Sequence, residues 1–308
     1  MGKFRDFLKR ITGISTPFGG ISWSPPPQKD GQTAIARILD SNCHNMFSSG
    51  VIFDETHNQA AWDRDDVPLL HRDLVKFAAL VQEKTKFPVE RGHSELNLGF
   101  LEGCKCLVLI CPRDAFLSQT EIDHIMKFVQ TGGACLICGY YLSDKHHRTN
   151  LSNLTALFGV RFRYDLIADQ IESCRDRYSI RCSTPEAQVP IIFDRSLRPV
   201  VPYACSLDIS LPAFPILMSG TSSYSEVPDV VHAGIVKSFK RDRDGGFAVG
   251  AACEYSRGRI VVFGTWEILT NTQMVASSDN SRFLERVIEW LLPQKGGVRN
   301  ERQPISFG

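Results

Sequence analysis

The stretch from Phe116 to Tyr141 constrains the fold more than any other part of this chain. Ser118 followed by Glu121 matches a capping box, in which each side chain bonds the backbone amide of the other residue at a helix start. Apolar residues then recur at helical spacing, at Ile122, Ile125, Met126 and Val129. A helix with one buried face is therefore predicted from Ser118 onward.

A strand is predicted on each side of this helix. Gly132-Gly133 can adopt the left-handed conformation that ends many helices. Residues 134–138 (ACLIC) follow, a run too short for a helix and apolar on both faces, which is typical of a buried parallel strand. Residues 106–111 (CLVLIC) form a second such run before the helix. Strand, helix and strand together predict a three-layer α/β fold with an open, mostly parallel sheet.

Other segments extend this pattern along the chain. Further strands are predicted at 51–53, 87–90, 247–255 and 259–263, and further helices from Pro68, over 149–160 and from a cap at Asp279-Asn280. Residues 161–250 contain many prolines and short alternating runs without helical period. We expect that segment to be a β-rich insertion in the domain.

The predicted domain spans residues 48–293, after an N-terminal arm (1–47) and before a flexible tail (294–308). In residues 3–12 one helical face is apolar, and the residues around it are basic (apolar Phe4, Phe7, Leu8 and Ile11; basic Lys3, Arg5, Lys9 and Arg10). Such a helix either packs on its own domain or docks on a partner or a membrane surface. Residues 13–32 are rich in Gly, Pro and Ser but carry aromatic residues, so this arm is expected to lie against a surface.

Composition excludes several classes of function. With 35 basic and 34 acidic residues, the chain has no net field that would favour nucleic acid. No apolar run approaches the roughly 18 residues of a membrane span, and the N-terminus lacks a secretory signal. A cytoplasmic protein with reduced thiols is expected. Cys135 and Cys138 should face opposite sides of one strand as small apolar residues.

Polar side chains follow three of the predicted strands, where ligands bind in open parallel sheets. The first group runs from Asp54 to Gln59, the second contains Tyr140, Tyr141, His146 and His147, and the third lies between Gly264 and Asn271. The predicted ligand-binding residues are Asp54, Glu55, His57, Asn58, Gln59, Tyr140, Glu267 and Asn271. Carboxylates, imidazoles, amides and aromatic rings together suit a small polar ligand or a peptide.

Nucleophilic catalysis is the alternative use of these groups. Cys138 ends a strand just before a glycine, where a nucleophile elbow would place a thiol. His57, His146 or His147 would act as base and Glu55 or Glu267 would orient it. An elbow requires small neighbours, however, and Leu136 and Ile137 precede Cys138. The histidines with Asp54 and Glu55 could also be read as metal ligands, but adjacent histidines are usually solvated loop residues. We predict no cofactor and no metal, and neither a P-loop nor a Rossmann fingerprint is present.

Four segments in this order resemble a known domain family. They read VIFDETHNQ (51–59), LSQTEIDHIMKFVQTGGACLICG (117–139), TNLSNLTALFGVRF (149–162), and GRIVVFGTWEILTN (258–271) with DNSRFLERVIEWL (279–291). Together they resemble the GIFT or DUF4350-type domain, related to class I glutamine amidotransferases and found in gliding-motility transporter subunits and an intraflagellar transport subunit. The resemblance covers about residues 50–293. It implies a flavodoxin-like, class I glutamine amidotransferase-like sheet that has lost the amidotransferase catalytic residues and serves binding or assembly.

We therefore expect a non-catalytic ligand- or protein-binding module. Residues 14–23 (ISTPFGGISW) are similar to the start of certain bacterial proteins, which suggests a bacterial source and identifies no activity. A polar rim without a complete catalytic constellation suggests a subunit or accessory factor of a bacterial multi-protein system. Protein partners are expected, with residues 1–32 as a route of contact. The alternative is a Cys- or metal-dependent hydrolase or amidase. For the loop after residue 53, either Asp54 and His57 tie down the loop itself, or they converge on open space beside Tyr140 and Glu267.

Overall fold

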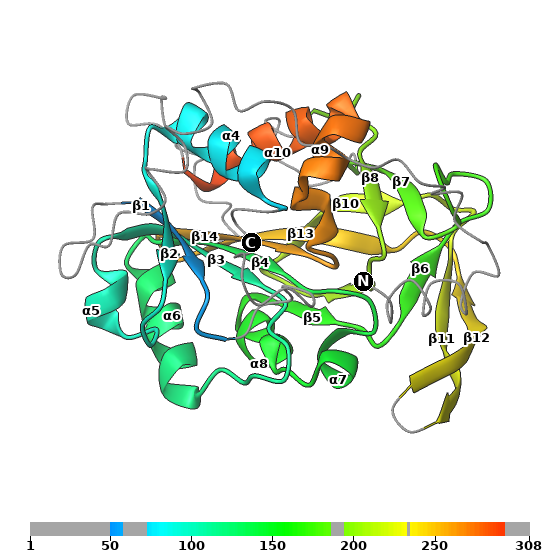
Figure 1. Ribbon diagram of the computed structural model, residues 1–308, viewed down its shortest axis with the longest axis horizontal. Coiled ribbons are helices and arrows are strands. Elements are labelled where there is room, and N and C mark those ends of the chain that lie inside the picture. The colour runs from blue at the N-terminus through cyan, green and yellow to red at the C-terminus, as the bar shows by residue number, and fades with distance from the viewer. Residues whose placement is uncertain (1–49, 58–72, 186–193, 233–234, 293–308) are drawn as a thin grey trace, which may run out of the picture.

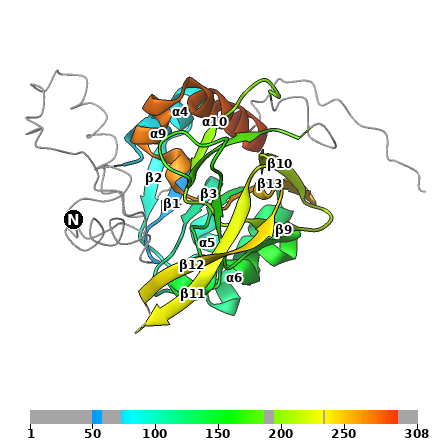
Figure 2. The ribbon, with the colours of Figure 1, turned by 90° about the vertical axis from the view of Figure 1, so that its right-hand side faces the viewer.

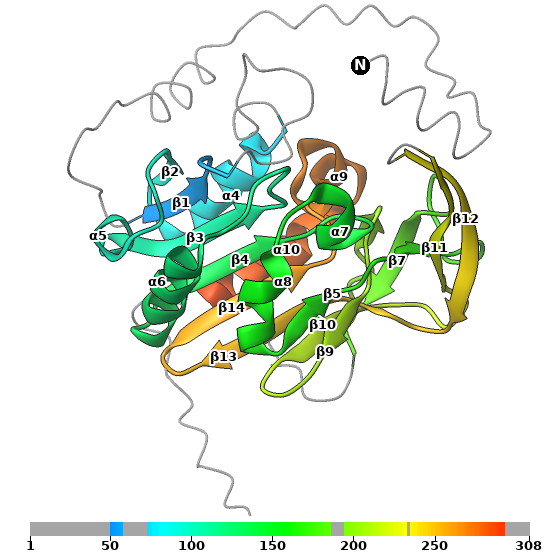
Figure 3. The ribbon, with the colours of Figure 1, turned by 90° about the horizontal axis from the view of Figure 1, so that it is seen from below.

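The structure, a computed structural model, describes residues 50–57, 73–185, 194–232 and 235–292. These residues form a three-layer α/β architecture in which helices cover both faces of a central sheet (Figure 1). Helices α4, α9 and α10 lie on one face, and α5, α6, α7 and α8 lie on the other (Figures 1 and 3). The predicted N-terminal arm and the tail from 294 lie outside the described residues.

The central sheet has nine strands and is mixed. In order across the sheet they are β2 (Val89–Gly92), β1 (Gly50–Asp54), β3 (Cys104–Ile110), β4 (Ala134–Cys138), β14 (Gly258–Phe263), β13 (Ala248–Tyr255), β10 (Phe214–Ser219), β7 (Ser179–Ser183) and β8 (Val200–Pro202). The first five run parallel to one another. The remaining four continue the sheet by antiparallel pairing. The prediction of a mostly parallel sheet is therefore correct for the first five strands and wrong for β13, β10, β7 and β8.

Two smaller sheets and nine helical segments complete the described fold. The small sheets pair β12 (Ile235–Asp244), β11 (Tyr224–His232) and β6 (Leu166–Ala168), and separately β5 (Val160–Phe162) and β9 (Leu207–Ile209). The helices are α4 (Val75–Thr85), α5 (Leu98–Leu101), α6 (Gln119–Gln130), α7 (Ser143–His147), α8 (Leu151–Thr155), α9 (Asn271–Ala276) and α10 (Ser278–Leu291), with 3₁₀ turns η1 (Ala156–Phe158) and η2 (Glu267–Leu269). The β11–β12 ribbon extends away from the central sheet (Figures 1 and 2).

Alternating side chains of the parallel strands supply two separate apolar cores. Leu136 and Cys138 of β4 pack in the core that also contains Phe77 of α4 and Phe283 of α10. Cys135 and Ile137 of the same strand pack in the opposite core, with α6 and α8. The prediction that Cys135 and Cys138 face opposite sides is confirmed, because side chains alternate along a strand.

The local predictions around α6 are confirmed in detail. The Ser118 hydroxyl accepts a hydrogen bond from the Glu121 amide at 3.2 Å, and the Glu121 carboxylate accepts one from the Ser118 amide at 2.9 Å. Gly132 adopts a φ of +114° after the helix, as a left-handed stop requires. Residues 51–53, 106–110, 135–138 and 259–263 are strands of one sheet.

Other predicted boundaries differ from the structure. Pro68 lies outside the described residues, and the helix predicted from it begins at Val75 as α4, with Leu74 as its N-cap residue. The helix predicted over 149–160 is α8 followed by η1, because Gly159 turns the chain at a φ of +84°. Asp279 and Asn280 were predicted to cap the last helix, and this was wrong. Ser277 is the N-cap residue, and Asn280 instead bonds the backbone of Val200.

Residues 161–250 contain strands β6 to β12, and the segment does not form a layer separate from the central sheet. Its strands β7, β8 and β10 extend the central sheet, while β11 and β12 form the projecting ribbon. Short strands with a period of two can add to an existing sheet edge, which the sequence of the insertion alone does not specify. None of the described helices is both long enough and apolar enough to cross a membrane.

Candidate functional site

The carboxyl ends of the parallel strands carry most of the predicted site residues. Asp54 ends β1, Tyr140 lies two residues beyond β4, and η2 with Glu267 follows β14. Since these strands run in the same direction, all three positions lie at one edge of the sheet. At that edge the described side chains form two groups, one around His57 and one around Glu267.

The first group places His57 between two buried carboxylates. Its Nδ1 lies 2.8 Å from Asp54 Oδ2, and its Nε2 lies 3.2 Å from Glu121 Oε1 of α6. Asp54 is fully buried, and Glu121 is 6% exposed. Asp54 Oδ1 also accepts a hydrogen bond from the Thr56 amide at 3.0 Å. The ring can donate at both nitrogens only as an imidazolium, so this geometry favours the charged form of His57.

The acid–base balance of this group follows from its contacts. Burial opposes charge on His57, but the hydrogen bond and charge of Asp54, with those of Glu121, raise the pKa of His57 above its ordinary value of 6.5. Burial also disfavours an ionised Glu121, but bonds from the Ser118 amide and hydroxyl and the charge of His57 lower the pKa of Glu121. An imidazolium therefore ties the end of β1 to the start of α6.

Glu55 points to a different set of partners. Its Oε2 lies 2.5 Å from Arg91 Nη2 and 3.8 Å from His93 Nε2. The Glu55 amide donates to the Gly92 carbonyl at 2.8 Å, so the loop continues alongside β2. Asn58 and Gln59, also predicted as ligand-binding residues, lie outside the described residues.

The second group joins two segments that the sequence analysis placed in different clusters. The Tyr140 hydroxyl, 1% exposed, donates a hydrogen bond to Glu267 Oε1. Burial raises the pKa of Glu267 to about 7; the Tyr140 bond opposes this shift, and the charges of Asp176 and Asp73 add to it. Near neutral pH this carboxyl can therefore accept or release a proton.

Three residues of this region were missed by sequence reasoning. Tyr203 donates to Asp176 Oδ2 at 3.0 Å, and both come from the insertion, whose pairing the sequence did not specify. The Trp266 ring centroid lies 5.9 Å from that of Tyr140. Its buried Nε1 has no hydrogen-bond partner in the described structure. Trp266 lies within the third predicted group, between Gly264 and Asn271, but it was not among the predicted ligand-binding residues.

Asn271, also a predicted ligand-binding residue, has a structural contact. Its Oδ1 accepts a hydrogen bond from the Lys76 amide at 2.8 Å, close to the start of α4. The Asn271 amide in turn donates to the Asp73 carbonyl at 2.7 Å. The side chain thus supplies an acceptor for a first-turn amide of α4, a group that has no partner within its own helix.

Cys138 does not have the surroundings of a catalytic thiol in a nucleophile elbow. It is fully buried, and burial raises the pKa of its thiol well above the ordinary value of 9.0. Its side chain packs on the face of the sheet covered by α4 and α10, whereas Glu121, the partner of His57, belongs to α6 on the other face. In the described residues the Cys138 thiol makes no hydrogen bond to a histidine.

The two adjacent histidines of α7 are not solvated loop residues. His147 is 3% exposed, and its Nε2 lies 3.0 Å from the Tyr141 carbonyl. Burial, with the neighbouring His146, lowers the pKa of His147 to about 3. Burial also lowers the pKa of His146. Both are therefore neutral near pH 7, and the part of the chain that the structure describes contains no cluster of three potential metal ligands.

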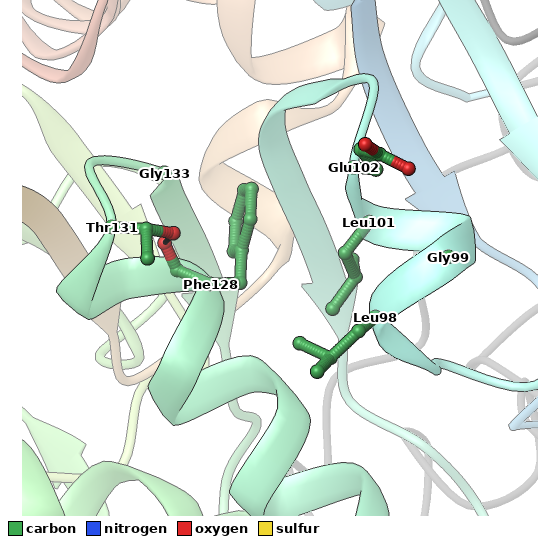
Figure 4. A pocket seen from close by; sticks show the side chains of 7 residues that line it. All are labelled: Leu98, Gly99, Leu101, Glu102, Phe128, Thr131 and Gly133. Carbon is green, nitrogen blue, oxygen red and sulfur yellow. Dashed lines mark hydrogen bonds between the residues drawn. The ribbon is translucent and has the colours of Figure 1, made fainter.

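A groove opens at the opposite edge of the sheet, between α5 and α6 (Figure 4). Its volume is about 360 Å³, and it is lined by Leu98, Gly99, Leu101, Glu102, Phe128, Thr131 and Gly133. A Cβ at Gly133 would lie 2.3 Å from the Phe128 ring, so only glycine lets this ring stand where it does. None of the predicted site residues lines this groove.

Comparison with known proteins identifies the fold and no family. No protein-family model matches the chain, and no curated protein matches it. Among solved structures, the mmIFT52 N-terminal domain is similar with a TM-score of 0.64 and 14% identity, over 81% of this chain and 99% of that one. A cytoplasmic protein of Salmonella typhimurium (TM-score 0.46, 12% identity, 79% and 98% covered) and a ThuA-like protein of Bacteroides uniformis (0.46, 9%, 82% and 96%) also match. At such identities only the fold is shared.

Proposed function

We propose that this chain is a non-catalytic protein-binding module, a subunit or accessory factor of a bacterial multi-protein system. The observation that carries the proposal is the separation of the groups that amidase chemistry would need. Cys138 lies in one apolar core, while Asp54, His57 and Glu121 are bonded to one another across the other face of the sheet. A thiol and a base on opposite faces cannot exchange a proton.

The contacts of His57 support a structural role for the Asp54 loop. Asp54 is fully buried and uses its oxygens on Thr56 and His57, and His57 continues to Glu121. An ion triad of this kind is already satisfied internally, which leaves little for a ligand to bind. Of the two readings of the loop, we therefore favour the one in which Asp54 and His57 hold it in place.

The similar fold of the mmIFT52 N-terminal domain supports the assignment to a binding module. In that protein the fold is an N-terminal domain. We further propose that the present chain is a GIFT or DUF4350-type relative of class I glutamine amidotransferases with a flavodoxin-like core. We place the protein in the cytoplasm, without a cofactor, with residues 1–32 as a contact to the partner. The runner-up is a Cys- or metal-dependent hydrolase or amidase.

Thiol reactivity separates these two functions. Cys138 should resist iodoacetamide in the native protein, because a buried thiol with a raised pKa is not nucleophilic. Cys174, which is exposed, is the internal reference and should be alkylated at least about tenfold faster. Mass spectrometry of peptides after timed alkylation gives both rates. Alkylation of Cys138 as fast as that of Cys174 would support the amidase reading and contradict ours.

Partner binding is tested by affinity purification from the native host. The tagged full chain and a variant lacking residues 1–32 are purified in parallel and their co-purifying proteins are quantified by mass spectrometry. We expect at least one protein to be recovered in near-stoichiometric amount with the full chain and to be lost with the variant. Recovery of no such protein with the full chain would contradict the binding-module proposal.

A further inference from the structure

In the groove between α5 and α6, the described residues leave one apolar side chain largely uncovered. Leu98 at the start of α5 is 45% exposed, while Leu101 and Phe128 form the buried floor. Glu102, an exposed carboxylate, lies at the same groove. Figure 4 shows Leu98, Leu101 and Phe128 turned toward one another across the opening. A groove of this kind suits one or two apolar side chains flanked by a basic group.

The chain enters the described structure beside this groove. β1 begins at Gly50, which pairs with Cys104, the first residue of β3. Leu101 and Glu102 of the groove immediately precede that strand, and Gly133 precedes β4. In Figure 3 the start of β1 lies next to α5. The 49 residues before Gly50 are therefore tethered at the edge of the sheet where the groove opens.

Residues 3–12 have the complementary pattern. Phe4, Phe7, Leu8 and Ile11 share one helical face. Lys3, Arg5, Lys9 and Arg10 surround that face and can pair with Glu102. Burying such apolar side chains stabilises a contact. Burial of this apolar face against an apolar surface would therefore be favourable, and Leu98 in the groove offers such a surface.

We infer that residues 3–12 dock in the α5–α6 groove of their own chain, with Phe7 and Leu8 against Leu98 and Phe128. The connection is long enough, since residues 13–49 number 37 and a random coil of that length has an end-to-end distance of about 30–35 Å. A tether of this length also gives an effective concentration in the millimolar range, which favours docking within one chain over docking between two. The basic side chains remain at the surface, available to the partner proposed above.

Photo-crosslinking of the full chain tests this docking. A benzoyl-phenylalanine is placed at Phe7, the purified protein is irradiated, and the crosslinked peptides are identified by mass spectrometry. We expect crosslinks to residues 98–102 or 128–133. Equal mixing of ¹⁴N- and ¹⁵N-labelled protein before irradiation reports whether the two crosslinked peptides come from one molecule, and we expect that they do.

A charge introduced in the groove provides the matched comparison. Leu98→Asp should lower the crosslink yield at least about fivefold, because it places a charge against the apolar face. Leu157→Asp is the control: Leu157 is 42% exposed and belongs to η1, away from the groove, so the yield should not change. If Leu98→Asp fails to fold, Glu102→Lys takes its place and should lower the yield about twofold or more.

Three results would overturn the inference. They are crosslinks elsewhere on the domain, an unchanged yield in the groove variants, and crosslinks in which mixed-label pairs are as frequent as same-label pairs, which is the result of pairing between separate molecules in an equal mixture. The last would mean that a second copy occupies the groove. None of these results depends on the proposed partner, because the experiment uses the purified chain alone. Its failure is therefore distinguishable from failure of the binding-module proposal.

Discussion

Replacing His57 with alanine is expected to destabilise the protein by about 3–5 kcal/mol, because it leaves buried Asp54 and Glu121 without their shared cation. The midpoint of urea unfolding at pH 6, monitored by circular dichroism, measures the change. His93→Ala is the matched control. Its side chain is 57% exposed and lies 3.8 Å from Glu55, so the loss should stay within about 0.5 kcal/mol.

The effect of His57→Ala should depend on pH in a defined direction. The folded-state pKa of His57 is raised, so its stabilisation is complete below the ordinary value of 6.5 and is lost as the pH rises through the folded-state pKa. The difference between wild type and His57→Ala should therefore shrink as the pH rises above 6.5 and through the folded-state pKa of His57. His147, whose pKa is lowered to about 3, acts in the opposite direction below 6.5, but it is present in both proteins and cancels in the difference.

A loss below about 1 kcal/mol at pH 6 would contradict this account of the triad. It would mean that water reaches the carboxylates and that the His57 contacts resemble surface ion pairs. A difference that grows as the pH rises would also contradict it, because a neutral ring would then be the stabilising form. Both outcomes would restore the possibility that Asp54 and His57 face a ligand.

Asn280→Ala is expected to cost about 2–4 kcal/mol, since it removes two hydrogen bonds and leaves two buried backbone groups unpaired. Asn280 is fully buried in α10; its Oδ1 accepts from the Val200 amide at 2.7 Å, and its Nδ2 donates to the Val200 carbonyl at 2.9 Å. The side chain therefore gives the Val200 backbone of β8 the two hydrogen bonds that a neighbouring strand would provide. Thermal or urea unfolding measures the loss.

Asp279→Ala separates this bridging role from a helix-capping role. The Asp279 carboxylate accepts from the Arg198 amide at 3.0 Å in an exposed position, so its loss should cost no more than about 1 kcal/mol. If both residues merely capped α10, the two variants would lose similar amounts, on the scale of about 0.5–2 kcal/mol. Equal losses would therefore contradict the structural role of Asn280.

The candidate site shows how far sequence reasoning reaches. Strand ends could be read from the sequence, and parallel strands place their carboxyl ends at one edge, so Tyr140 and Glu267 were correctly placed near each other. Glu121 was read only as part of the Ser118 capping box. Its second role, as a partner of His57, depends on α6 packing beside β1, which joins residues 64 positions apart. No local pattern encodes such a contact.

The sequence could argue against Cys138 as a nucleophile but could not place it relative to the histidines. Its flanking Leu136 and Ile137 already argued against a nucleophile elbow. Which face of β4 it occupies relative to the histidines was decided by the order of the strands and by the helices on each face. Likewise, Tyr203 and Asp176 reach the region of Glu267 only because the insertion adds its strands to the central sheet.

The sequence by itself determined the elements whose causes are local. The capping box of α6, the glycine stop at Gly132, the alternation of Cys135 and Cys138 and the strand character of the core segments all follow from backbone bonding and apolar periodicity over a few residues. Tertiary structure alone decided the antiparallel half of the sheet, the ion triad of His57 and the bridge from Asn280 to Val200. These contacts join distant segments, and polar side chains take whichever buried partner the packing brings to them, because an unpaired buried polar group is too costly to keep.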